Sequence, residues 1–247
     1  MAVSKVKKND KNLLDLVVSS IQEDTLDNSL EQIVVDAFSD TLPLIKDEEL
    51  KKFISSIFYR IFLYKSMAGS AFWESPASLN EGEHPPDEYE NDGLLIHTRR
   101  VAKIAMCMGS AVSLSDDDMD TLLAAALLHD VTKAVYCDEE LNLTHDPLHI
   151  YTIDSFIHFM RSDDVKKSND NKNHTLNVAP EKISNIIRLI HCSHGVWSPI
   201  LETLPQTELE KILAMANYTA EHLHILLPDL FMIFEKKIEQ DNDGQPN

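Results

Sequence analysis

An all-α fold is predicted by three features of the sequence. Apolar residues recur at helical spacing along most of the chain, and no segment shows the sustained alternation that is typical of a β-strand. The 247 residues include only 6 glycines and 10 prolines, too few for a turn-dense sandwich, a barrel or a Gly-rich phosphate loop. With 43% hydrophobic residues, the chain can form one globular domain, alone or with a modest extension.

The N-terminal part is expected to hold a short disordered start and then three helices. Residues 1–12 are polar, with no apolar stretch behind their basic cluster, so we do not expect them to act as a signal peptide. Residues 13–70 form a predicted N-terminal helical extension, either completing the core or mediating a homo-oligomer. Its apolar residues at helical spacing are Leu13, Leu14, Leu16, Val17 and Ile21, then Leu30, Ile33, Val34, Ala37 and Phe38, then Phe53, Ile54, Ile57, Phe58, Ile61 and Phe62.

Residues 71–235 are expected to form the main helical domain. Its first segment, 74–92, is dense in helix breakers and is predicted to be a loop. A helix is then expected from Leu94 to about Met108, with apolar residues on its inner face.

The next helix has the clearest start in the sequence. Ser115 offers an N-cap oxygen, and three aspartates that follow it favour a helix N-terminus. Residues 122–128 are then apolar on every side, which predicts the central buried helix of the fold. That helix is expected to end at His129 and Asp130.

The rest of the chain is expected to continue as helices separated by loops. Pro180 favours a helix start, because proline is tolerated at the first helical position. The expected segments are a helix over about 147–160, a polar surface loop over 161–178, a helix over 180–191, a helix over 205–226 and a disordered tail over 236–247.

The charge and cysteine content narrow the classes of function. A net charge of −19 disfavours broad, non-specific binding to nucleic acid, but a local metal ion or basic side chain can still attract a small anion. The three cysteines are scattered and form no C-x-x-C pair, which argues against a disulfide framework or a thiolate zinc site. The longest apolar runs are too short to span a bilayer. We expect a soluble, cytoplasmic protein without a membrane partner.

The doublet His129–Asp130 is the strongest chemical signal. The doublet follows seven apolar residues directly, and the Asp130 carboxylate costs several kcal/mol to bury there unless a cation meets it. A divalent metal ion held by imidazole and carboxylate groups is the simplest such cation.

Five short motifs occur in order around this doublet. They are P-A-S at 76–78, G-L-L-I-H-T at 93–98, L-L-H-D-V-T-K at 127–133, H-C-S-H-G at 191–195 and A-N-Y-T-A at 216–220. In this combination the chain resembles the HD-domain superfamily of metal-dependent phosphohydrolases, and in particular the subgroup with HD-type 3′→5′ exoribonucleases, HD-type relaxases and phage or plasmid HD proteins. The resemblance implies an HD-domain helical bundle.

The resemblance also implies metal ligands. His97, His129 and Asp130 match the first three ligands of the family, and the fourth position holds Asn217 where the family has an aspartate. An amide oxygen brings no charge, so the substitution is expected to weaken metal binding. Glu221, one helical turn on, is an alternative ligand. A site that has lost its metal and only binds a ligand is another alternative.

Some family members bind a second metal ion with extra histidines. Here His145 or His149 would act with His191 or His194, and the alternative is that these are capping or surface residues. A helix continuing past His191 would place it on one face with His194. The expected cofactor is one or two divalent transition metal ions, namely Mn²⁺, Fe²⁺, Co²⁺ or Ni²⁺, with Mg²⁺ also possible.

Four residues are candidates for contact with substrate. Lys133 is expected to contact the phosphate and to act with Asp130 in catalysis, although it also suits the role of a cation at a helix C-terminus. Arg100 is a second candidate for phosphate, while His84 would reach the substrate from its loop. Trp197 is a candidate for stacking on a base.

The leading functional hypothesis is a metal-dependent phosphohydrolase that cleaves a phosphoester of a nucleotide or a similar small molecule. The first alternative is a 3′→5′ nuclease on single-stranded nucleic acid, which the charge disfavours. The second alternative is a binding or regulatory module whose catalysis is weakened by Asn217.

Overall fold

The computed structural model describes residues 34–68, 75–78, 82–90, 92–134, 153–154, 157, 178–197, 203–226 and 228. Every regular element in these residues is a helix, so the prediction of an all-α fold is confirmed. None of these helices is both long enough and apolar enough to cross a membrane.

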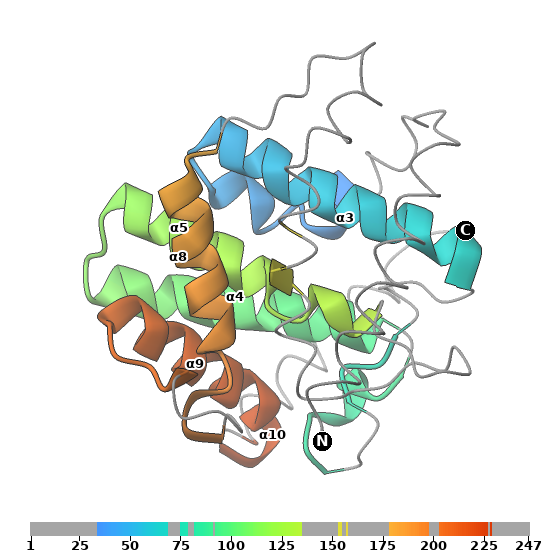
Figure 1. The fold of residues 1–247 in the computed structure, drawn as a ribbon. Helices are drawn as coiled ribbons and strands as arrows, with labels where there is room; N and C mark the ends of the chain where they lie inside the picture. The colour runs from blue at the N-terminus through green and yellow to red at the C-terminus, as the bar shows by residue number, and fades with distance from the viewer. Residues whose placement is uncertain are drawn as a thin grey trace, which may run out of the picture.

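The helix α5 (Asp116–Leu128) is the centre of the fold (Figure 1). It begins as predicted, because the Ser115 hydroxyl accepts a hydrogen bond from the backbone N–H of Asp118. All of its residues from 120 to 128 are buried. Helix α4 (Gly93–Ala111) packs along both α5 and α9 (Glu208–Glu221).

Helix α3 (Glu48–Ala68) and the short η1 (Leu42–Leu44) belong to the same core as α5. The core residues from this part of the chain are Val34, Phe38, Leu42, Ile45, Leu50, Phe53, Ile54, Ile57 and Phe58. Residues 34–58 therefore complete the core, which is one of the two roles left open by the sequence. The helix expected to begin at Leu13 lies outside the described residues.

Buried Asp120 fixes the start of α3 on α5. Its carboxylate accepts hydrogen bonds from the backbone N–H groups of Lys46, at 2.9 Å, and Asp47, at 2.8 Å. Asp47 in turn caps the first turn of α3 through the N–H groups of Glu49 and Leu50. A buried acid thus satisfies backbone donors that would otherwise be unpaired.

The C-terminal helices follow the prediction closely until His222. Helix α8 covers Pro180–His191, the short η6 covers Gly195–Trp197, and α9 begins with a capping box of Thr207 and Glu210. The last predicted helix was expected to run unbroken to residue 226. It is instead interrupted at His222, which donates a side-chain hydrogen bond to the Tyr218 carbonyl and stacks on its ring, and α10 (Leu223–Leu226) follows.

The structure describes only some residues of the helix predicted over 147–160 and of the loop predicted over 74–92. Of the helix expected over 147–160, the structure describes residues 153, 154 and 157, all helical. The described parts of the expected loop over 74–92 contain one short helix, η3 (Pro86–Glu88).

The loop before α4 is folded tightly onto the start of that helix. The Glu88 carbonyl accepts a hydrogen bond from Ala77, at 2.8 Å, and Ser75 accepts one from the N–H of Leu94, at 2.9 Å. A Cβ at Gly93 would lie 2.2 Å from the Glu88 carbonyl oxygen. Only glycine therefore permits this close approach, which brings the Glu88 side chain to His97 and Arg100 in the first turns of α4.

Candidate metal centre

Four of the predicted metal ligands meet at one buried point. His97 comes from α4, His129 and Asp130 from the end of α5, and Asn217 from α9. The Nε2 atom of His97 lies 3.3 Å from Nε2 of His129, 3.6 Å from Oδ2 of Asp130 and 3.0 Å from Oδ1 of Asn217. The first three residues have the spacing of a metal-binding group.

The other ring nitrogens show how the two imidazoles are oriented. Nδ1 of His129 lies 2.8 Å from the Ala126 carbonyl, and Nδ1 of His97 lies 3.0 Å from the Glu88 carboxylate. Both partners only accept hydrogen bonds, so both Nδ1 atoms carry a proton. The Nε2 lone pairs of the neutral rings then face each other and the Asp130 carboxylate, which Lys133 also contacts. The two facing nitrogens require a cation or a proton between them.

The pKa shifts of the two histidines differ. Burial lowers the pKa of His129 from 6.5 to about 4, so this ring is neutral at pH 7. Burial also acts to lower the pKa of His97, but the Glu88 and Asp130 carboxylates outweigh it, and its pKa is raised. A proton on His97 therefore stabilises the acceptor cluster in the metal-free protein, and a metal ion would displace it.

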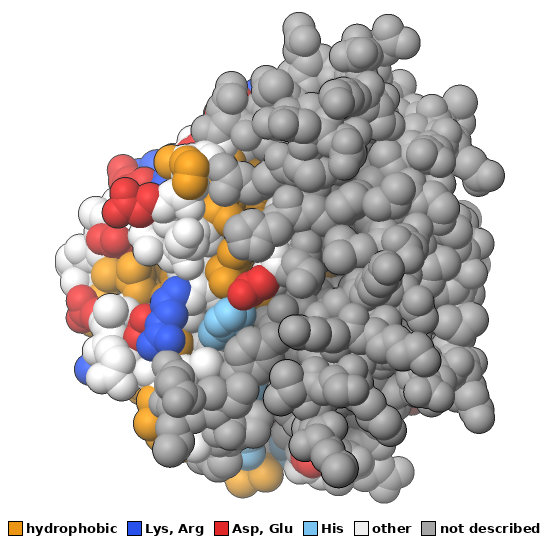
Figure 2. Space-filling model, viewed as in Figure 1, with side chains coloured by type: hydrophobic (Ala, Val, Ile, Leu, Met, Phe, Trp, Pro, Cys, Tyr) orange, Lys and Arg blue, Asp and Glu red, His pale blue; other side chains and the backbone are white. Residues whose placement is uncertain are grey.

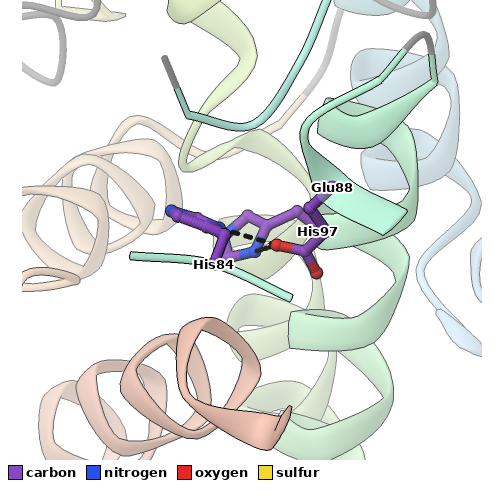
Figure 3. Close-up of side chains that lie close together, drawn as sticks. All are labelled: His84, Glu88 and His97. Carbon is purple, nitrogen blue, oxygen red and sulfur yellow. Dashed lines mark hydrogen bonds and ion pairs between the residues drawn. The ribbon is translucent and has the colours of Figure 1, made fainter. Parts of the chain in front are cut away.

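Glu88 is the main functional residue that the sequence reasoning missed. It is completely buried and accepts hydrogen bonds from His84, at 2.6 Å, and His97, at 3.0 Å (Figure 3). Arg100 forms an ion pair with its other oxygen. Burial alone would raise the pKa of Glu88, but the His97 charge, the two imidazole hydrogen bonds and Arg100 lower it to about 2.

His84, Glu88 and His97 also have the spacing of a metal-binding group. However, both imidazoles turn a protonated Nδ1 toward Glu88, and Arg100 already neutralises this carboxylate. This second cluster is therefore a support for His97: it fixes the tautomer that leaves Nε2 as a ligand, as outer carboxylates do in many metal sites.

Lys133 is held beside Asp130. Its ammonium group lies 2.7 Å from Oδ2 of Asp130 and 3.2 Å from the Ala77 carbonyl. The P-A-S motif thus positions the lysine through a backbone oxygen. Arg100 pairs with Asp87 and Glu88 in this structure, and its role as a phosphate contact stays a prediction.

A cavity of about 380 Å³ adjoins the cluster. Asn217 and His84 belong to its lining, which connects the predicted substrate contact to the candidate metal centre. The other described residues of its lining are Glu83, Ser193, His194, Ala214, Tyr218, Glu221 and His222.

Of the four histidines proposed for a second metal ion, the structure describes His191 and His194. Helix α8 ends at His191, and Gly195 adopts a left-handed conformation with φ of 55°. His191 pairs with Asp154 at 2.9 Å, whereas His194 lines the cavity, so the two do not share one helix face. His145, His149 and the side chain of Trp197 lie outside the described residues.

Comparison with known proteins identifies the family. The HD domain model matches residues 94–221, which is more than half of the chain and includes His97, the His129–Asp130 doublet and Asn217. No curated protein and no solved structure gives a significant match. HD domains bind divalent metal ions and are typically metal-dependent hydrolases. The chain belongs to the HD-domain family.

Proposed function

We propose that this protein is a metal-dependent phosphohydrolase that cleaves a phosphoester of a nucleotide or a similar small molecule. The observation that carries the proposal is the convergence of the His97 and His129 Nε2 atoms on the Asp130 carboxylate, with both Nδ1 protons directed elsewhere.

The residues fit a divalent transition metal ion. Two neutral imidazole nitrogens, a carboxylate oxygen and an amide oxygen form a donor set suited to Mn²⁺, Fe²⁺, Co²⁺ or Ni²⁺. When bound, such an ion supplies positive charge to the phosphoryl oxygens and makes a water molecule more acidic.

The protein's own side chains would orient the substrate. Lys133 has three N–H donors, so it can keep its contacts with Asp130 and the Ala77 carbonyl and still donate to a phosphoryl oxygen. His84 lines the cavity, and the hydrogen bond from its Nδ1 to Glu88 fixes the orientation of the His84 ring. In hydrolysis, the water oxygen bonds to phosphorus, and the ester oxygen leaves and takes up a proton.

A small substrate agrees better with the described surface than a polymer does. The cavity lies within the range of about 300–1,000 Å³ that is usual for small-molecule sites. On the face shown in Figure 2, acidic and basic side chains of the described residues are interspersed and form no continuous basic surface. A nucleic-acid backbone is usually bound by a continuous basic surface, so single-stranded nucleic acid is kept as the alternative substrate in the assay.

A binding module without turnover is the second candidate, and Asn217 is the observation that favours it. With an amide at this position, Asp130 is the one carboxylate among the four converging side chains. A weaker metal site with fewer charges would then serve recognition of a phosphorylated ligand rather than its hydrolysis.

The test is a hydrolysis screen of the full chain with Mn²⁺, Co²⁺, Ni²⁺ and Mg²⁺ added separately. The substrates are nucleoside mono-, di- and triphosphates, simple phosphate esters and short single-stranded oligonucleotides. We expect release of phosphate or nucleoside from a small ester, lost in Asp130→Ala and His129→Ala and kept in Asp116→Ala, which removes an exposed acid from α5.

The other outcomes separate the alternatives. Cleavage confined to oligonucleotides, with binding that falls steeply as salt rises, would replace the small substrate with a nuclease activity. Metal binding with no turnover of any substrate in the panel would support the binding module.

A further inference from the structure

The side-chain amide of Asn217 has two chemically different ends, and only one suits a metal ion. Its oxygen can coordinate a cation, whereas its NH₂ group would repel one. In the structure Oδ1 faces His97 Nε2 at 3.0 Å, and Nδ2 donates to Oε1 of Glu221 at 2.9 Å. The orientation of the amide thus depends on what lies at each end.

The His97 end selects the amide oxygen only while Nε2 of His97 carries a proton. If the amide were reversed, its NH₂ group would donate to the Nε2 lone pair of a neutral His97, which is an acceptable hydrogen bond. The amide oxygen would then face the Glu221 carboxylate, with two acceptors in contact. The Glu221 end therefore keeps the Asn217 oxygen pointing into the acceptor cluster when His97 is neutral, as it must be to bind a metal ion.

Glu221 occupies this position because of helix geometry. It is the last residue of α9 and lies four residues after Asn217, so the two side chains share one face of the helix. It is half-buried and lines the cavity together with Asn217. Its carboxylate contacts the amide NH₂ group, the end of Asn217 that points away from His97.

We propose that Glu221 is a positioning residue that turns the Asn217 oxygen toward the metal ion. The inference rests on the proposed metal centre. In this arrangement Asn217 supplies a neutral ligand atom. The negative charge of Glu221 lies behind Asn217, at the end of the amide that points away from the metal ion. A bound ion would then keep more of its positive charge for an anionic substrate than it would beside a second carboxylate ligand.

The first test measures binding of Mn²⁺ and Co²⁺ to the full chain by calorimetry. Glu221→Ala removes the acceptor and is expected to weaken binding about tenfold or more, the usual effect of losing an outer partner of a ligand. Glu221→Gln keeps an acceptor oxygen for the Asn217 NH₂ group and is expected to retain affinity within about threefold. Glu208→Ala, an exposed glutamate at the other end of α9, is the matched control and is expected to bind like the unmodified chain.

The second test asks whether Glu221→Gln changes metal affinity differently in the unmodified chain and in Asn217→Asp. In Asn217→Asp the new carboxylate would face Glu221, so repulsion would offset part of the gain from the added charge. Glu221→Gln is therefore expected to strengthen metal binding at least threefold in the Asn217→Asp background, although it does not strengthen it in the unmodified chain. The visible spectrum of bound Co²⁺ reports whether the ligand set changes in each variant.

The outcomes distinguish this inference from the proposed function. If the unmodified chain binds no divalent ion, both are wrong. If it binds an ion and Glu221→Ala binds equally well, the positioning role is wrong while the metal centre stands. If Glu221→Gln strengthened metal binding in both the unmodified chain and Asn217→Asp, or weakened it in both, the positioning role would also be wrong. Thermal unfolding without metal shows whether each variant is folded.

Discussion

His97 lies between two buried carboxylates that have very different surroundings. Glu88, on its Nδ1 side, is met by donors only: two imidazole N–H groups and the Arg100 guanidinium. Asp130, on its Nε2 side, is met by Lys133 and by two imidazole nitrogens whose protons lie on the far side of their rings. The comparison indicates that a buried carboxylate with its donors complete supports the structure, whereas one that faces acceptors is prepared for a cation.

The largest expected effect is on folding stability at the Glu88 side. Glu88→Ala leaves Arg100 without its buried partner and two imidazole N–H groups without an acceptor, so we expect a loss of about 3–5 kcal/mol in the free energy of unfolding. Asp130→Ala also takes a carboxylate away from buried Lys133. It is expected to cost less, because Lys133 keeps its contact with the Ala77 carbonyl and the repulsion between the carboxylate and the His129 lone pair is relieved. Urea unfolding of both metal-free variants measures the difference, and a larger loss for Asp130→Ala would reverse the comparison.

The next effect is on metal affinity at the Asp130 side. Asp130→Ala removes the one carboxylate among the four converging ligands, and we expect binding of Co²⁺ to weaken about 100-fold or more. His84→Ala, on the Glu88 side, removes a group that supports His97 through Glu88 and through the edge of its ring, and is expected to weaken binding less than tenfold. Calorimetric titration of both variants provides the comparison, which equal losses would contradict.

Stability should depend on pH in two separate windows. The pKa of His129 is lowered to about 4 in the folded protein, so the unfolded chain binds this proton more readily and stability falls as pH decreases from 6.5 to about 4. The pKa of Glu88 is lowered to about 2, so its stabilisation is lost between about pH 4.5 and 2. Each window is expected to contribute roughly 1–3 kcal/mol in urea unfolding of the metal-free chain.

Single substitutions show which residue is responsible for the loss of stability in each pH range. His129→Gln is expected to flatten the upper window, and Glu88→Gln the lower one. His97 acts in the opposite direction, because its raised pKa stabilises the metal-free fold below pH 6.5 and this contribution is lost as pH rises. A lower window that persists in Glu88→Gln would show that another acid is responsible for it.

The smallest effect concerns the glycine that places Glu88. Gly93→Ala puts a Cβ against the Glu88 carbonyl, 2.2 Å away, and is expected to cost about 1–3 kcal/mol and to weaken metal binding. Gly109→Ala is the matched control on the same helix, because its Cβ meets the ends of the flexible Met119 and Leu114 side chains. Equal thermal midpoints for the two variants would show that the close approach at Gly93 is not required.

The helical framework could be predicted from local sequence signals. Ser115 and the aspartates after it marked the start of α5, Pro180 marked the start of α8, and the apolar run at 122–128 identified the buried helix. These signals are local because capping and helical periodicity act within one or two turns. The break at His222 was not predicted, although its contact with Tyr218 is also local, within one helical turn.

The candidate site was predictable only in part. His129 and Asp130 were identified from the cost of burying a charge, and His97 and Asn217 from the family resemblance. Glu88 gave no such signal, because it lies in a breaker-rich loop without periodicity and reaches His97 through the close approach at Gly93. Asp120 was missed for a similar reason, since its backbone partners at 46 and 47 are distant in sequence.

The most direct test of the metal centre is a titration of the full chain with Co²⁺, followed by its visible absorption, in the unmodified protein and in His129→Ala and His84→Ala. If the ion binds between His97, His129 and Asp130, the absorption band appears in the unmodified chain, persists in His84→Ala and disappears in His129→Ala. A band that survives in His129→Ala and disappears in His84→Ala would place the ion on the Glu88 side of His97 and contradict the assignment.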